Sequence, residues 1–295
     1  MIMIATLPIK VSGRLFGTEQ LNIIRGVISE SPTSLRTEIA RRVCAALDWH
    51  DARGDLKAMS CRVALLRLHR EGFIELPAPR NGNGNGKPLS TRCVELPEPL
   101  PMSCPVNQLD GLALQLVHTK SDSTLWNTLI DQHHYLGYQP LPGAQLRYLI
   151  RWQGGLLGAI GWGAAAWKVA PRDQWLGWNA EAREAGLPRV LNNARYLILP
   201  WIRCRNLASK VLSLSERCVA NDFEARYAVR PVLLETFVEK ERFRGTCYRA
   251  ANWQHLGHTQ GRGKCDRDRQ ASLPIKDLYV RPLVRDFRLR LGAMP

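Results

Sequence analysis

The fold is decided by a stretch that opens with the apolar run Asn193-Ala-Arg-Tyr-Leu-Ile-Leu-Pro-Trp-Ile202. This run predicts a β-strand, and the spacing of apolar residues after the turn at 203–209 predicts a helix over 210–217. A second strand is expected at 231–238, followed by a helix and a closing strand in the polar and aromatic segment 242–257. Because N–H groups at the start of a helix attract anions, the turn at 203–209 would suit a phosphate-bearing ligand.

The strongly basic composition favours a polyanionic partner. The 295 residues carry a formal net charge of +15, with a sequence pI near 9.9, and such an excess is most often matched by DNA or RNA. The alternative is a basic protein from an arginine-rich proteome. The length allows one full domain and a smaller one.

The cysteine pattern and the lack of long apolar runs indicate a reduced, cytoplasmic protein. The eight cysteines contain no C-x-x-C pair, which argues against a zinc ribbon and against a disulfide framework. No apolar run approaches the roughly 20 residues that span a bilayer, so no membrane partner is expected. The N-terminus lacks the basic start of a signal peptide.

A segment rich in glycine and proline divides the chain. It covers residues 77–105 and contains the alternating Asn-Gly stretch 81–86, which has no apolar side chains to bury. We therefore predict a first domain at 1–76, a linker at 77–105 and a second domain at 106–295.

The first domain is predicted to be a winged helix-turn-helix that binds DNA. Helices are expected at 18–29, after the N-cap Ser34, and at 59–70, followed by a strand at 71–77 and a Gly-rich tip. In that fold the third helix enters the major groove and the wing touches phosphates. The cations placed to do so are Arg62, Arg67, Arg70, Arg80 and Lys87. The alternative is a small helical bundle used for protein contacts.

The second domain alternates strands and helices, which predicts a mixed α/β (α+β) fold. Strands are expected at 112–118, 146–152 and 156–162, and helices at 124–134 and 179–191. This order resembles that of GNAT-type acyltransferases, whose cofactor turn has the form Q/R-x-x-G-x-G/A. The sequence Arg203-Cys-Arg-Asn-Leu-Ala208 departs from that form at Asn206, a residue type that tolerates left-handed backbone.

The GNAT resemblance implies a cofactor site and a catalytic acid. An acetyl-CoA-like cofactor would be held by the turn residues Arg203, Arg205, Asn206, Leu207, Ala208 and Ser209. Tyr248 stands where those enzymes often carry a general acid. His134 could act as the base, because the pKa of histidine lies near neutrality. The alternative for His133 and His134 is a helix C-cap that ends at Gly137.

Two further segments could contact nucleic acid. The loop at 161–178 interleaves cations with tryptophans, which suits stacked or flipped bases, and the alternative is that its tryptophans belong to the core. These are Trp162, Trp167, Trp175 and Trp178. The loop at 259–264 would contact backbone phosphate, or else be a solvated loop. The DNA-binding residues predicted in these segments are Lys168, Arg172, Arg262 and Lys264.

Glu235 is the third candidate for a catalytic residue. It lies on a strand expected at the centre of the sheet, where a buried carboxylate needs a partner such as Arg195 or Arg249. It could alternatively join Asp131, Asp266 and Asp268 as ligands of a metal for DNA cleavage. The spacing of these acids does not favour that arrangement, and no metal site is predicted.

One distinctive string is Arg242-Phe-Arg-Gly-Thr-Cys-Tyr-Arg-Ala-Ala-Asn-Trp253, and others stand at 134–137, 158–171, 192–195, 234–238 and 259–264. Together they resemble the DruA family, named for the Druantia anti-phage defence system and also found with transposase domains. The resemblance implies a role on DNA in defence or in mobile elements, with other defence or transposition proteins as partners. It supplies no catalytic residue.

Three hypotheses stay open. The first is a DNA-associated defence or mobile-element protein whose second domain binds nucleic acid or an acyl-CoA-like cofactor, with Tyr248 as acid and His134 as base if it is an enzyme. The second is a metal-dependent nuclease or transposase component. The third is a DNA sensor without catalysis that recruits an effector.

Overall fold

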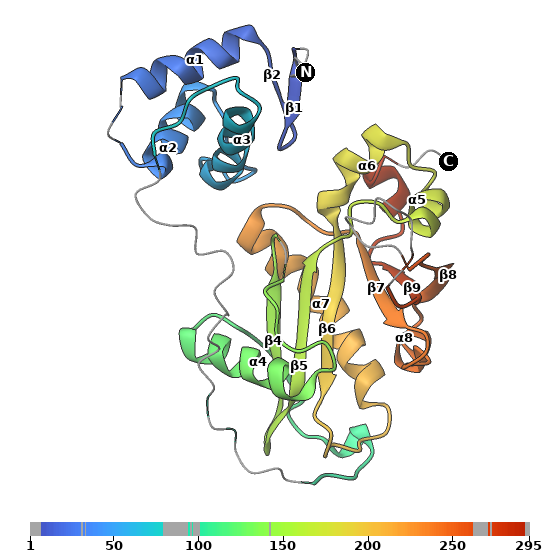
Figure 1. The fold of residues 1–295 in the computed structure, drawn as a ribbon. Helices are drawn as coiled ribbons and strands as arrows, with labels where there is room; N and C mark the ends of the chain where they lie inside the picture. Colours follow the sequence, from blue (N-terminus) through green and yellow to red (C-terminus); the bar gives the residue numbers. More distant parts are fainter. Residues whose placement is uncertain are drawn as a thin grey trace. The chain divides into compact units, whose positions relative to one another are not determined.

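The chain forms two compact units, residues 1–89 and 90–295 (Figure 1). The computed structural model describes residues 7–30, 32, 34–78, 94, 96, 101–141, 143–261, 271 and 273–292. Each unit has a hydrophobic core of its own.

The first unit is a three-helix fold preceded by a β-hairpin. The hairpin pairs β1 (Ile9–Val11) with β2 (Arg14–Phe16), and the helices are α1 (Thr18–Ser29), α2 (Arg36–Ala46) and α3 (Ala58–Arg70). Apolar residues at helical spacing turn inward from all three helices, which confirms the predicted helices. The buried ones are Leu21, Ile24, Ile39, Val43, Cys61, Leu65 and Leu68. The hairpin before α1 was not predicted.

The strand predicted at 71–77 is wrong, because this segment pairs with no strand in the described part of the chain. Side chains satisfy its backbone instead: Arg25 of α1 donates to the Phe73 carbonyl at 2.8 Å, and Arg36 of α2 donates to the Pro77 carbonyl at 2.7 Å. The residues predicted to form the wing, including Arg80 and Lys87, lie outside the described residues. The winged form of this unit therefore stays a prediction.

The second unit is built on a mixed sheet whose seven described strands have the order β3-β4-β5-β6-β7-β9-β8, which confirms the mixed α/β class. The bounds are β3 (Ala113–Leu116), β4 (Leu146–Trp152), β5 (Gly155–Ala164), β6 (Val190–Ile198), β7 (Leu233–Glu239), β8 (Gln254–His258) and β9 (Lys276–Pro282). Among these strands only β6 and β7 run parallel. The other neighbouring strands are antiparallel.

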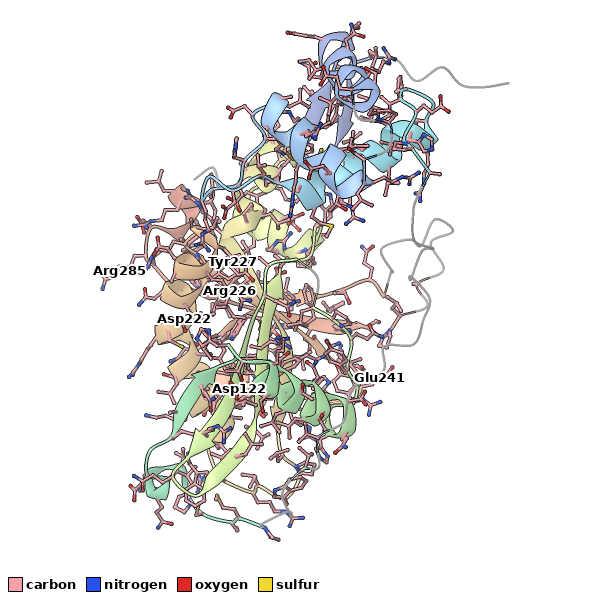
Figure 2. The ribbon with its side chains drawn as sticks, turned by 90° about the vertical axis from the view of Figure 1, so that its left-hand side faces the viewer. Asp122, Asp222, Arg226, Tyr227, Glu241 and Arg285 are labelled. Atoms are coloured by element: carbon pink, nitrogen blue, oxygen red, sulfur yellow. The ribbon has the colours of Figure 1, made fainter. Side chains whose placement is uncertain are left out.

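Two long helices cover opposite faces of the sheet. In Figure 1, α4 (Lys120–His133) lies in front of β4 and β5, and α7 (Leu207–Tyr227) lies behind them. Helix α7 buries an apolar stripe that includes Val211, Val219 and Phe223. A hydrogen bond also joins it to β4, because the Tyr148 hydroxyl donates to Asp222 of α7 at 2.7 Å. Figure 2 labels Asp222 on this helix.

Several shorter elements differ from the prediction. The helix expected at 179–191 ends early: α6 (Ala180–Gly186) passes through the 3-10 turn η2 (Leu187–Arg189) into β6. Strand β9 was not predicted, although it lies between β7 and β8. The remaining helices are α5 (Ala170–Leu176), α8 (Thr246–Ala250), α9 (Phe287–Arg290) and the 3-10 turn η1 (Val106–Gln108). No helix within the described ranges has both the length and the apolar character needed to cross a membrane.

Strands β6 and β7 start together and then separate. Their parallel pairing joins residues 190–193 of β6 to residues 233–236 of β7 and goes no further, and the two ribbons diverge beyond this point in Figure 1. Asn193 and Thr236 form the last pair. The sheet is therefore open between the later residues of these two strands.

A substitution at Gly158 should test the close packing of β5 on β6. A Cβ atom at this position would lie 2.0 Å from the Leu197 carbonyl oxygen, which belongs to the backbone and cannot move aside. We expect Gly158→Ala to lower the free energy of unfolding of the second unit by about 1–3 kcal/mol, measured by thermal and denaturant unfolding.

The control is Gly26→Ala on α1, where an added Cβ meets nothing within 4 Å. This control should leave stability unchanged or raise it slightly, because alanine favours a helix more than glycine does. An unfolding curve of Gly158→Ala that matches the wild type would contradict the pairing of Gly158 with β6.

Candidate functional site

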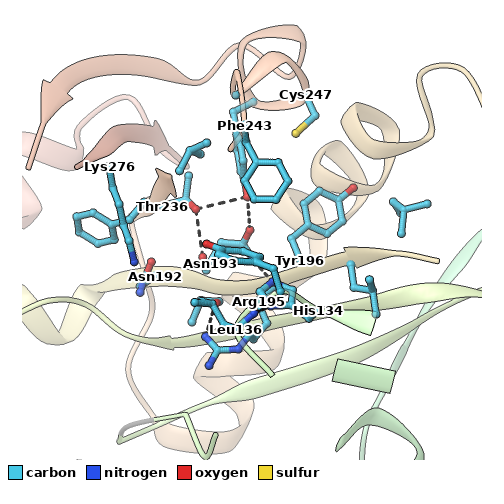
Figure 3. Close-up of a pocket in the computed structure, with 18 of the residues that line it drawn as sticks. His134, Leu136, Asn192, Asn193, Arg195, Tyr196, Thr236, Phe243, Cys247 and Lys276 are labelled. Carbon is cyan, nitrogen blue, oxygen red and sulfur yellow. Dashed lines mark hydrogen bonds between the residues drawn. The ribbon is translucent and has the colours of Figure 1, made fainter. Parts of the chain in front are cut away.

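The space between the diverging strands is a pocket of about 700 Å³ (Figure 3). Its walls are residues 194–198 of β6 and 236–238 of β7. The end of α4 with the residues after it, 133–136, closes one side, and the segment 243–248 that leads into α8 closes another. A volume of this size is typical of sites for small molecules and cofactors.

A hydrogen-bond network centred on Asn193 closes the pocket where the strands part. The Tyr248 hydroxyl donates to Asn193 Oδ1 at 2.7 Å, and the Thr236 hydroxyl donates to the Asn193 carbonyl at 3.1 Å (Figure 3). The Asn193 amide nitrogen donates to the carbonyls of Gly161 and Arg195. One residue thus joins three neighbouring strands and α8.

Tyr248, the predicted acid, lines the pocket and is buried. Burial raises the pKa of its phenol above the ordinary value, so the hydroxyl keeps its proton at neutral pH. That proton is shared with Asn193 in this structure. The role of Tyr248 as a general acid stays a prediction.

His134, the predicted base, lines the same pocket. Burial first, and then the nearby positive charge of Arg195, lower the pKa of His134 to about 4, so the ring is neutral at pH 7. Its Nδ1 accepts a hydrogen bond from the Leu136 amide at 3.2 Å, which leaves the proton of the neutral ring on Nε2. In this tautomer Nε2 is a hydrogen-bond donor, which does not favour a general base.

The helix-cap alternative for these histidines agrees with the geometry. His134 follows the last residue of α4, and its amide donates to the Ile130 carbonyl at 3.0 Å. Gly137 has a φ of +60° and its amide donates to the His134 carbonyl. The His133 ring packs edge-on against Trp201, with ring centroids 5.1 Å apart.

Polar atoms without partners gather around the pocket. Five buried side-chain nitrogen and oxygen atoms of the described residues have no hydrogen-bond partner, and three of them are His133 Nε2, Asn192 Oδ1 and Arg195 Nε. All three residues line the pocket. Buried polar atoms in native proteins are nearly always paired, so each exception calls for an explanation.

The pocket is positively charged. Arg195, Arg244 and Lys276 line it, and none of its lining residues in the described part of the chain is Asp or Glu. No acidic side chain in the described ranges forms an ion pair with Arg195. A cavity lined by one sign of charge attracts the opposite sign, so the pocket is suited to an anionic ligand.

The prediction from the sequence did not include Asn193 and Thr236 among the site residues. It named Arg195 only as a possible partner of Glu235. One signal could have pointed to them. Asn192-Asn-Ala-Arg195 places three polar residues inside an otherwise apolar strand, and buried polar side chains in a strand need a specific reason.

The predicted cofactor turn lies outside the pocket lining. Asn206 does adopt the left-handed backbone that the sequence suggested, with a φ of +64°. The turn pairs with another segment of the unit: the Met102 amide donates to the Trp201 carbonyl at 3.1 Å, and the Arg203 amide donates to the Met102 carbonyl at 2.8 Å. The Ala208 carbonyl accepts from the Tyr196 hydroxyl at 2.6 Å, which links the turn to the pocket wall.

The remaining turn residues differ in exposure. Arg203 and Arg205 are exposed, Ser209 is half-buried and Leu207 is buried. Helix α7 has no side-chain cap at its start. Binding of a cofactor by this turn stays a prediction.

The expected partners of Glu235 were wrong. Its carboxylate is fully buried and pairs with Arg172, with Glu235 Oε2 and Arg172 Nη1 2.8 Å apart. It also accepts from the Ala166 amide at 3.0 Å. Arg172 pairs with Asp173 as well, at 2.7 Å. Glu235 does not line the pocket, so the geometry gives it a structural role.

Arg172 therefore cannot be part of a DNA-binding surface in this structure, because its side chain is 0% exposed. The tryptophans of the same segment divide into two kinds. Trp162 and Trp178 are buried, as the core alternative expected, whereas Trp167 is 56% exposed next to the exposed Lys168. Trp175 is half-buried and stacks on Phe287, with ring centroids 5.3 Å apart.

The other predicted site residues are separate from the pocket. On α3, Arg67 is exposed and pairs with Glu71, Arg70 is exposed, and Arg62 is half-buried. Asp131 accepts from the Tyr138 amide. Arg262, Lys264, Asp266 and Asp268 lie outside the described residues. Across the described ranges, no group of three or more His, Cys, Asp or Glu side chains could hold a metal ion.

A comparison with protein-family models found one that covers most of this chain. The model described as Druantia protein DruA matches residues 67–272. The chain belongs to the DruA family. The matched residues include most of the pocket-forming unit and the end of α3. A search of curated proteins found no match to the sequence.

Solved structures similar to this DruA-family chain include several acetyltransferases. An aminoglycoside acetyltransferase, AAC(6')-Ib in complex with coenzyme A, shares 16% identity over 60% of this chain and 98% of its own, with a TM-score of 0.40. An N-acetyltransferase from Staphylococcus aureus Mu50 shares 10% identity over 58% of this chain and 98% of its own, with a TM-score of 0.33. Likeness at this level supports no inference about a ligand or an activity.

A substitution at Glu235 should separate a structural role from a catalytic one. Glu235→Ala leaves the Arg172 guanidinium buried with only one carboxylate partner among the described residues. Because the variant leaves an Arg172 N–H group and the Ala166 amide without their carboxylate acceptor, while Asp173 still compensates the guanidinium charge, we expect the free energy of unfolding to fall by about 1–3 kcal/mol for each unpaired group, measured by denaturant unfolding.

The matched control is Glu241→Ala, which removes an exposed carboxylate from the same unit (Figure 2). This control should change stability by less than about 0.5 kcal/mol. Wild-type stability in Glu235→Ala would show that the ion pair is not a structural element.

Proposed function

We propose that this DruA-family chain acts on DNA in anti-phage defence, and that its second unit binds a phosphate-bearing ligand in the pocket between β6 and β7. The observation that carries the ligand proposal is the cluster of unpartnered polar atoms at His133, Asn192 and Arg195. The three residues line a pocket of about 700 Å³ with three cationic and no acidic lining residues in the described chain. Such a site suits an anion better than an amine.

The ligand class includes acyl-CoA-like cofactors and nucleotides, because both carry phosphate groups together with N–H donors. A bound phosphate would accept hydrogen bonds from Arg195, and a ligand N–H group would donate to Asn192 Oδ1. The tautomer of His134 and the absence of acidic residues from the described pocket lining argue for binding rather than for acyl transfer to an amine. If transfer does occur, Tyr248 remains the candidate acid.

Calorimetric titration with coenzyme A and acetyl-CoA tests whether the second unit binds an acyl-CoA-like cofactor. We expect Arg195→Ala to weaken binding about 10- to 100-fold, the range of a charge-assisted hydrogen bond. Arg203→Ala tests whether the turn before α7 holds the pyrophosphate and should weaken binding to a similar degree. Arg285→Ala removes an exposed cation elsewhere in the unit and should bind as the wild type does.

The proposal of an acyl-CoA-like cofactor fails if neither compound binds at millimolar concentration. It also fails if both bind but Arg195→Ala and Arg203→Ala match the wild type.

The first unit offers a surface for duplex DNA on α3. Met59 and Val63 are 68% and 55% exposed, and Arg67 and Arg70 continue the same face of the helix. Exposed apolar groups beside arginines suit the major groove, where the thymine methyl lies next to base edges and phosphates. The helix order supports a helix-turn-helix role for this unit.

Salt dependence of DNA affinity tests this surface. A cationic protein releases counterions from DNA, so the logarithm of the binding constant should fall steeply with the logarithm of salt concentration. Arg70→Ala should weaken binding to duplexes of any sequence and reduce that slope by about 1. Arg42→Ala on α2, whose charge is paired with Glu38, is the control. A flat salt response would reject the DNA proposal.

A metal-dependent nuclease or transposase component remains the alternative. Its metal ligands would be Asp131 together with Asp266 and Asp268, which lie outside the described residues. Glu235 would not be among them, because its carboxylate is paired with Arg172. Membership of a defence-system family supports other defence proteins as partners.

A further inference from the structure

The mouth of the pocket carries an exposed aromatic pair that the proposed function does not use. Tyr135 follows α4 and Phe243 precedes α8, and their ring centroids lie 5.2 Å apart at an interplanar angle of 62°. They are 37% and 45% exposed, and both line the pocket. Leu136, 41% exposed, lies beside them. Large apolar side chains exposed at the rim of a cavity mark a surface that a ligand covers.

Cations surround this aromatic pair. The Arg242 guanidinium lies over the Tyr135 ring, 5.0 Å from its centroid, and Glu239 approaches Arg242 at 3.4 Å. Arg244 is exposed and lines the pocket, and Arg195 lies on the wall of β6. Aromatic rings next to arginines along a cationic groove are the arrangement that binds single-stranded nucleic acid.

The unpartnered atoms of the residues that line the pocket require both kinds of hydrogen-bonding partner. Arg195 Nε is a donor in need of an acceptor, whereas Asn192 Oδ1 is an acceptor in need of a donor. A phosphate offers acceptors only, so it cannot satisfy Asn192. A nucleobase edge carries donors as well as acceptors, and a nucleotide therefore supplies both partners.

We infer that the pocket between β6 and β7 receives an unpaired nucleotide of a DNA strand, with its phosphate at Arg195 and its base against Tyr135 and Phe243. This inference rests on the proposed function, because it names the ligand of the same pocket. A DNA strand fits better than a free nucleotide for one reason. Arg242 and Arg244 lie at the rim, where they can contact phosphates on either side of the inserted nucleotide.

The test compares DNA with and without unpaired nucleotides, using the full chain. Two fluorescent DNA hairpins share one duplex, and one of them has a three-nucleotide single-stranded overhang with 2-aminopurine at its second position. Anisotropy gives both affinities, and 2-aminopurine fluorescence reports stacking. We expect the overhang to bind about 10-fold more tightly than the blunt hairpin, in the range of one stacked base, and its fluorescence to be quenched.

The variants assign this preference to the pocket. Arg195→Ala and Phe243→Ala should remove the preference and the quenching while leaving affinity for the blunt hairpin unchanged. Phe243 is half exposed, so its variant should fold even if Arg195→Ala does not. Arg285→Ala is the matched control, because Arg285 is exposed on the opposite side of the second unit from Glu241 in Figure 2. It should retain both the preference and the quenching.

Equal affinity for the two hairpins would overturn the inference, and so would a preference that survives in both pocket variants. Coenzyme A or a deoxynucleoside monophosphate is added as competitor. If either binds in an Arg195-dependent manner while the overhang gives no preference, the proposed function stands and this inference fails. If no ligand depends on Arg195, both fail.

Discussion

The hydrogen bonds of Asn193 fix the point at which the central sheet divides. Its side chain accepts from Tyr248 and donates to carbonyls on β5 and β6, while its own carbonyl accepts from Thr236 on β7. Removing one partner from any of these hydrogen bonds would leave the other buried and unpaired. The resulting loss of folding free energy exceeds the net stabilisation that the bond itself contributes. Because the network is satisfied within the protein, the strands can diverge at this position without a ligand to hold them apart.

The two buried polar sites of the second unit differ in how their charges are balanced. On one side of β7, the carboxylates of Glu235 and Asp173 are balanced by the guanidinium groups of Arg172 and Arg183, and this cluster needs no charge from outside. On the pocket side, Arg195 has no acidic partner within the described ranges, and its half-buried position lowers the pKa of its guanidinium. A structural ion pair and an incomplete site can therefore lie near each other on the same sheet, and only the incomplete one calls for a ligand.

Local patterns predicted the helices of the first unit and most strands of the second, because apolar spacing depends on neighbouring residues. Resemblance identified Tyr248, the ordinary pKa of histidine identified His134, and both residues line the pocket. The rest depends on contacts far apart in sequence. Arg172 was predicted to be exposed because charged residues usually are. It is buried instead, and its partner Glu235 is 63 residues away in the sequence, where local patterns cannot indicate a pairing. Tyr135 and Phe243 meet only because α4 ends beside the segment before α8. Strand β9 joins the sheet between two strands that precede it, which periodicity cannot show.

The divergence of β6 and β7 also bears on how the molecule resists self-association. Unpaired backbone groups on a strand edge recruit strands from other chains, and proteins limit this risk by shortening or covering their edges. In the described part of the second unit, the outer strands β3 and β8 have only four and five residues. The unpaired residues 194–198 of β6 and 237–238 of β7 line the pocket instead, where the end of α4 and the segment before α8 stand beside them. A fold that keeps an opening for a ligand thus avoids offering that opening as a template for aggregation.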